Sequence, residues 1–142
     1  MDNQSLIREF LAHRIEPAGF DHVAHVRVAW LLLEQFPFEQ ALQEFEAGAM
    51  DLATRAGVPE KYHATITLTL MQIIAADRYG RVWLSWQDYC DSRPAVLNDA
   101  KSLLLRYYSP GLIFGETARL QWCKPDRRPL PVMDTTAILR SA

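Results

Sequence analysis

The chain has 142 residues, of which 49% are hydrophobic and 23% charged, and its formal net charge at pH 7 is -2. This size and composition are typical of one globular domain with one core, and they exclude a largely disordered chain. The slightly acidic balance lacks the basic surface that binds nucleic acid, and the longest apolar run, residues 28–33, is too short to span a membrane.

The N-terminal segment resembles no export signal, because Arg8 and Glu9 interrupt the apolar stretch that such a signal needs. Cys90 and Cys123 are isolated, and no Cys-x-x-Cys spacing occurs. This usage is typical of free thiols in a reducing compartment. We therefore expect a soluble cytoplasmic protein whose partners include neither nucleic acid nor a membrane.

The first part of the chain has apolar residues at the spacing of four amphipathic helices. The predicted ranges are 5–14, 21–35, 37–55 and about 59–78. Asp21 is a suitable N-cap for the second helix, and Pro37 and Pro59 suit the first turns of the third and fourth. The β-branched run 65–69 is compatible with a strand, but the length of the surrounding pattern favours helix.

Three further helices are predicted after Gly80, and a proline-rich tail follows them. The helices cover residues 83–89, 95–108 and 116–122. From about residue 124 the chain is too rich in proline to be helical, and we expect Asp126, Arg127 and Arg128 to pin it against the surface. The prediction is an all-α, single-domain helical bundle of about five to seven helices over residues 1–142, with an extended tail.

The histidines form the only cluster of residues whose types suggest chemistry. His22, His25 and His63 lie near two predicted helix starts, and His13 lies near the end of the first helix. Short loops make consecutive helices alternate in direction, so these positions are expected at one end of a bundle. His22 and His25 are three residues apart and share a helix face, which lets two imidazoles contact one ion.

Three histidines with an open coordination position suit zinc, iron or manganese. Such a metal lowers the pKa of a bound water and delivers hydroxide to a substrate. Further candidate ligands are His13, Glu16 and Glu60. The alternative interpretation is structural, because a histidine in a first helical turn often bonds a carbonyl or carboxylate, and His-x-x-His alone is a weak motif.

Two other residues are candidates for a ligand pocket. Arg27 lies on a mainly apolar helix, where it needs a carboxylate partner or captures a substrate carboxylate. Thr67 lies one turn from His63 in the predicted helix. The neighbouring Thr65 and Thr69 face a polar cavity or bond back to the preceding turn.

Three segments together resemble a family of small, uncharacterised bacterial helical proteins. They are Phe20-x-His22-x-x-His25-Val-Arg-Val-Ala-Trp30, Lys61-Tyr-His63-x-Thr-Ile-Thr67 and Leu105-Arg-Tyr-Tyr-Ser-Pro110. The resemblance covers most of the chain and implies an all-helical bacterial domain with a histidine pair. A glutamate often follows the third histidine in that family, whereas this chain has Ala64. The family has no settled activity, so the resemblance implies no reaction.

Two functions follow from these patterns. The first is a metal-binding protein that holds a divalent transition metal through His22, His25 and His63 and acts on a small molecule. The second is a non-enzymatic ligand-binding or protein-interaction module with structural histidines. Wide apolar helix faces are also compatible with a homodimer.

Overall fold

The structure, a computed structural model, describes residues 1–133 and contains only helices, turns and irregular segments over that range. Nine α-helices and one 3₁₀ turn lie within these residues, and five of the helices have seven residues or more. None of these helices is long and apolar enough to cross a membrane. The predicted all-α fold is confirmed. The last nine positions of the predicted tail, 134–142, lie outside the described residues.

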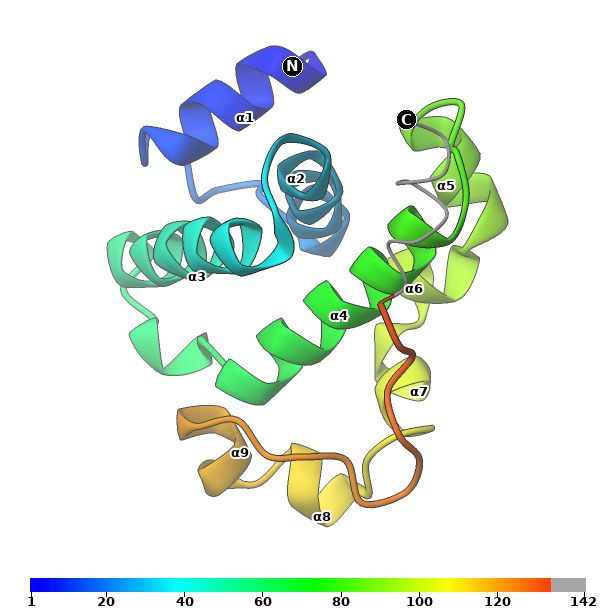
Figure 1. Cartoon of the computed structure of the whole chain (residues 1–142). Helices are drawn as coiled ribbons and strands as arrows, with labels where there is room; N and C mark the ends of the chain where they lie inside the picture. The colour runs from blue at the N-terminus through cyan, green and yellow to red at the C-terminus, as the bar shows by residue number, and fades with distance from the viewer. Residues whose placement is uncertain (134–142) are drawn as a thin grey trace. The chain divides into compact units, whose positions relative to one another are not determined.

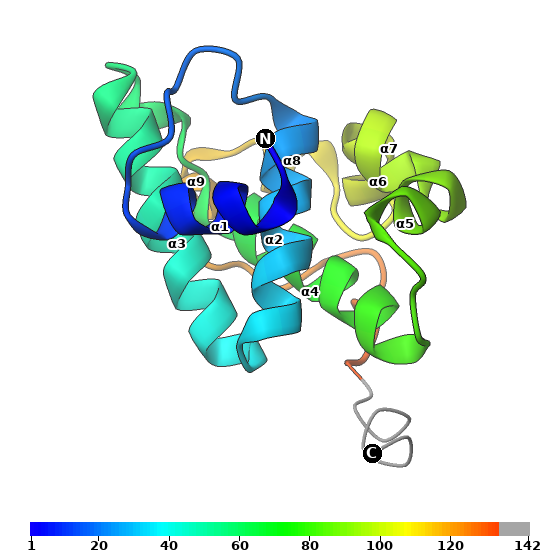
Figure 2. The same cartoon turned by 90° about the horizontal axis from the view of Figure 1, so that it is seen from above.

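The chain forms two compact units, the first covering Met1–Tyr62 and the second beginning at His63. The first unit contains α1 (Asn3–Leu11), α2 (His22–Gln35), α3 (Phe38–Arg55) and a 3₁₀ turn (Pro59–Lys61). α1 packs against both α2 and α3 (Figures 1 and 2). The first three predicted helices are therefore present, with ends within a few residues of the predicted ones. The prediction of one domain stays a prediction.

Local sequence explains where the helices of the first unit begin and how closely they pack. Asp21 caps α2, because its Oδ1 accepts the backbone N–H of Ala24 at 2.9 Å. α2 is buried from Val28 to Leu33, which is the longest apolar run of the sequence. Gly48 on α3 faces the ring of the buried Phe10, and a Cβ there would overlap that ring. The glycine therefore permits the close contact of α1 with α3.

The second unit is built around α4 (Ala64–Gly80). The shorter helices that follow are α5 (Trp86–Ser92), α6 (Pro94–Asn98), α7 (Ala100–Leu104), α8 (Pro110–Ile113) and α9 (Glu116–Leu120). After α9, residues 121–133 contain neither helix nor strand, and we call them the strap. The strap runs from the end of α9 past α8 toward α4 (Figure 1).

Three predicted helices of the second half differ from the structure. The helix expected over residues 83–89 covers Trp86–Ser92 instead. The helix expected from Pro59 begins only at Ala64, because Pro59–Lys61 form a 3₁₀ turn and His63 is the N-cap. The helix expected over residues 95–108 is divided at Asp99, whose backbone angles, φ -146° and ψ 46°, are not helical. The Ser109-Pro-Gly sequence, which follows the helix predicted over residues 95–108, begins α8, since proline suits a first helical position.

Candidate functional site

His25 lies in an aromatic cluster of the first unit. Its ring packs edge-on against Phe20 and Phe45, with centroid separations of 4.6 and 6.2 Å. Its Nδ1 lies 2.8 Å from the carbonyl oxygen of Asp21. A carbonyl only accepts, so Nδ1 carries the proton and Nε2 keeps the lone pair. Burial lowers the pKa of His25, which keeps the ring neutral.

The lowered pKa of His25 predicts a loss of stability in acid. Between the lowered folded pKa and the unfolded value of about 6.5, the unfolded chain binds more protons. The free energy of unfolding should therefore fall as pH falls below about 6.5. Urea unfolding between pH 7.5 and 5 should show this slope in the wild type and a smaller one in His25→Gln. His13→Asn is the matched control, because His13 is exposed at φ 56°, a conformation that asparagine tolerates. An unchanged slope in His25→Gln would contradict the prediction.

Arg27, a candidate for capturing a substrate, makes contacts within the first unit. Its Nε and Nη2 donate to Oδ1 of Asn3 at 2.9 and 2.6 Å, and Nη2 also donates to the carbonyl of Met1 at 3.1 Å. These bonds tie α2 to the N-terminal end of α1. Arg27 thus has a structural use in the fold, and its role in a ligand pocket stays a prediction.

His63 uses both ring nitrogens to organise the second unit. Its Nδ1 accepts the backbone N–H of Ile66 at 3.1 Å, which caps α4. Its Nε2 donates to the carbonyl of Ile113 at 2.7 Å, which joins the start of α4 to the end of α8. A neutral ring with its proton on Nε2 makes both of these bonds. A metal at either nitrogen would replace one of the two bonds.

The other predicted metal ligands have no common site within a unit. His22 is the exposed first residue of α2, and the side chains of His13, Glu16 and Glu60 are exposed in the first unit. Among residues 1–133, neither unit contains three or more His, Cys, Asp or Glu side chains grouped to hold a metal ion. The three-histidine metal site therefore stays a prediction.

The threonines of α4 have two different roles. Thr67, the predicted ligand residue, donates back to the carbonyl of His63 at 2.8 Å, as helical threonines commonly do. Thr65 and Thr69 are fully buried. Thr65 Oγ1 donates to the carbonyl of Gln121 at 2.9 Å and accepts the N–H of Cys123 at 3.0 Å. This side chain thus holds the beginning of the strap.

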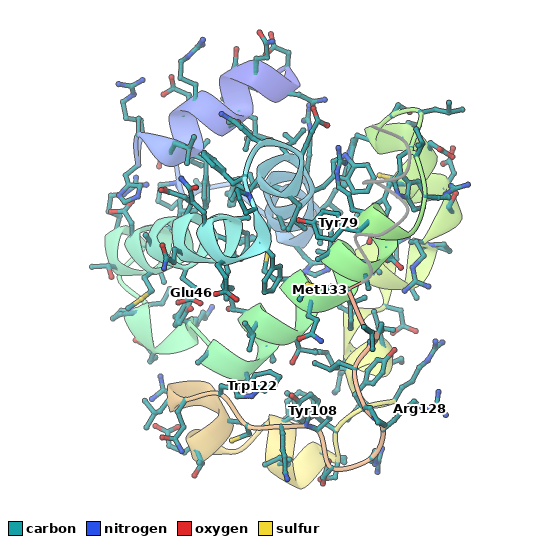
Figure 3. All side chains as sticks on the ribbon, viewed as in Figure 1. Glu46, Tyr79, Tyr108, Trp122, Arg128 and Met133 are labelled. Carbon is teal, nitrogen blue, oxygen red and sulfur yellow. The ribbon has the colours of Figure 1, made fainter. Side chains whose placement is uncertain are left out.

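A second chain of hydrogen bonds leads from α4 to the same part of the strap. Thr69 Oγ1 lies 3.3 Å from the Tyr108 hydroxyl, which donates to the carbonyl of Cys123 at 2.6 Å. Trp122 covers Tyr108 edge-on, with a centroid separation of 6.5 Å (Figure 3). Sequence reasoning missed this role of Thr65 and Thr69, although their spacing of four residues places them on one face of a helix.

The segment between α4 and α5, residues 81–85, exposes apolar side chains on a fixed backbone, and we call it the apolar loop. Val82 is 77% exposed and Leu84 is 90% exposed. Between them, Trp83 donates from Nε1 to the carbonyl of Asp77 at 3.0 Å, and the Arg81 guanidinium lies 3.7 Å from the Trp83 ring centroid. The apolar loop is therefore anchored at its centre.

Hydrogen bonds also fix the end of the apolar loop at the start of α5. Ser85 caps α5 by accepting the N–H of Asp88 at 3.1 Å, and the Asp88 carboxylate accepts the N–H of Leu84 at 3.2 Å. These two reciprocal bonds act like a capping box. On α4, Asp77 Oδ2 accepts hydrogen bonds from the Tyr89 hydroxyl and from Arg93 Nε, both at 2.9 Å. Burial raises the pKa of Tyr89, so its hydroxyl stays a donor.

Comparisons with protein-family models, curated proteins and solved structures find no match for this chain. The resemblance to a family of small bacterial helical proteins stays an expectation from the three sequence segments.

Proposed function

We propose that this chain is a non-enzymatic protein-interaction module whose histidines stabilise the fold. The use of both ring nitrogens of His63 within the second unit supports the structural half of this proposal. The observation that carries the interaction half is the apolar loop, which presents Val82 and Leu84 to solvent. Large apolar side chains that are both exposed and held in place are typical of contact surfaces.

The apolar loop suits insertion into a pocket of a different protein. Covering a valine or leucine side chain is worth about 1.5–3 kcal/mol, and a backbone that is already fixed reduces the entropy lost on binding. Two side chains cover far less than the roughly 800 Å² that each partner contributes to a stable interface. The loop alone therefore favours a protein with an apolar pocket over a second copy of this chain.

Site-specific photo-crosslinking in cells tests this proposal. A benzophenone amino acid replaces Leu84 in one variant and Gln87, an exposed residue on α5, in the control. We expect one discrete adduct from position 84, which Val82→Ser weakens, and no such adduct from position 87. Equal adducts from both positions, or none from position 84, would overturn the proposal. An adduct of twice the chain mass would instead support the homodimer.

Metal binding is the second candidate function, and one observation favours it. Metal-bound histidines usually donate their other ring N–H to a carbonyl or carboxylate, and His25 donates in this way to Asp21. Neutral imidazole is also the form that binds zinc, iron or manganese. Activity on a small molecule would depend on such a metal.

A further inference from the structure

The strap is anchored before and within a short proline-containing segment. Before the segment, Asp126 accepts the N–H and the hydroxyl of Ser109 at 2.7 and 2.6 Å. The backbone N–H of Arg127 donates to Tyr107, and its guanidinium donates to the carbonyl of Leu105 at 2.8 Å. Within the segment, Gln72 on α4 donates to the carbonyl of Pro131 at 3.2 Å.

The segment that follows the first anchor and contains the second is Arg128-Pro129-Leu130-Pro131-Val132. Each proline fixes its own φ and biases the preceding residue toward extended geometry, so the sequence favours a polyproline II helix with three residues per turn. Arg128, Pro129 and Val132 are exposed, whereas Leu130, Pro131 and Met133 are half-buried, so one side of the segment faces solvent.

Two adjacent arginines of the strap differ in their contacts. Arg127 donates to Leu105 and Tyr107 and so holds the strap in place. Arg128, labelled in Figure 3, is exposed, and its guanidinium has no hydrogen-bond or ion-pair partner among residues 1–133. Anchoring the strap therefore explains Arg127 but leaves Arg128, Pro129 and Val132 unexplained.

We propose that Arg128–Val132 is a preformed polyproline II ligand for a partner domain with an aromatic-lined groove and an acidic side chain at its edge. Such grooves bind prolines between aromatic rings, and an acidic residue pairs with the arginine that flanks them. Pro129 and Val132 enter the groove from the exposed edge, and Arg128 forms the ion pair. Because the anchors already order the backbone, binding orders few additional residues.

This interaction surface is separate from the apolar loop, and its residues differ from those that the crosslinking experiment changes. The two proposals can therefore fail independently. The main alternative is that the segment only stabilises the fold. In that case, because one edge of the strap is half-buried, too little of its surface is exposed for a groove to bind.

Binding of purified full-length chain to a panel of SH3 domains that read arginine-flanked proline ligands tests the proposal. Calorimetry should detect binding by at least one domain, and Arg128→Ala should weaken it about tenfold. Arg106→Ala is the matched control, since Arg106 is exposed in the second unit outside the strap, and it should change the affinity less than about twofold. Neither variant should shift Tm.

A synthetic peptide of residues 124–133 separates the remaining outcomes. Binding of the panel by the full chain with at least the affinity of the peptide supports a preformed ligand. Binding by the peptide alone would show that the folded chain hides the segment and would overturn the proposal. Binding by neither, or an equal loss in Arg106→Ala, would overturn it as well.

Discussion

Replacing Thr65 by valine should lower the free energy of unfolding by about 2–4 kcal/mol, a large effect for an exchange of nearly equal volume. The Thr65 hydroxyl is fully buried, and it both donates to the Gln121 carbonyl and accepts from the Cys123 N–H. Valine removes both bonds, which leaves the Cys123 N–H unpaired and leaves the Gln121 carbonyl only a long contact of 3.8 Å from Cys123 Sγ. Urea unfolding measures the loss.

Thr67→Val is the matched control for this change. Thr67 is two residues away on the same helix, but its hydroxyl bonds only to the carbonyl of His63, one turn earlier. We expect its replacement to change stability by less than about 0.5 kcal/mol, because that carbonyl keeps its helical N–H partner. Limited tryptic cleavage after Arg127 should also become faster in Thr65→Val and not in Thr67→Val. Equal losses in the two variants would contradict this account of the strap.

The helical fold was predictable because its signals are local. The Asp21 cap and the continuous apolar sequence of α2 are both visible in the sequence, and the structure confirms both. The division of the helix predicted over residues 95–108 had a weaker signal. Asn98 and Asp99 are poor helix formers whose side chains compete for backbone bonds, and the chain leaves helical geometry there. A helix prediction from apolar periodicity alone does not include that competition.

The roles of the site residues depend on contacts that are distant in sequence. The bond from His63 reaches a carbonyl 50 residues away, and the bond from Thr65 reaches one 56 residues away. Sequence spacing placed His63 inside a helix and selected Thr67 because of its position one turn later. Neither inference could anticipate that the C-terminal part of the chain returns to α4. The prediction of three converging histidines required the same kind of long-range information.

The roles of neighbouring residues in the strap show the same limit. Proline content predicted that the tail is not helical, and the expectation that Asp126 and Arg127 pin it agrees with their bonds to Ser109 and Leu105. Arg128 received the same prediction, but it makes no such bond among the described residues. The charged residues therefore indicated that the segment is pinned to the surface. The different roles of Arg127 and Arg128 could be read only from the three-dimensional contacts.

His63→Ala should lower the free energy of unfolding by about 2–3 kcal/mol if the histidine is structural. The change removes the cap acceptor for the Ile66 N–H and the donor to the Ile113 carbonyl, so both the start of α4 and the end of α8 lose a partner. His63→Asn should recover about half of this loss, because asparagine is a good N-cap but is too short to replace the Nε2 donor. Chemical unfolding of the three proteins measures this order.

Elemental analysis of the same three proteins, purified without a histidine tag, decides between the structural and the metal-binding roles of His63. The structural role predicts little zinc, iron or manganese in any of them and a loss of stability in the order wild type, Asn, Ala. The metal-binding role predicts near-stoichiometric metal in the wild type that disappears in both variants, since asparagine supplies no imidazole. A metal content that falls with an unchanged unfolding midpoint would therefore reject the structural role, because both ring nitrogens of His63 would then be dispensable for the fold.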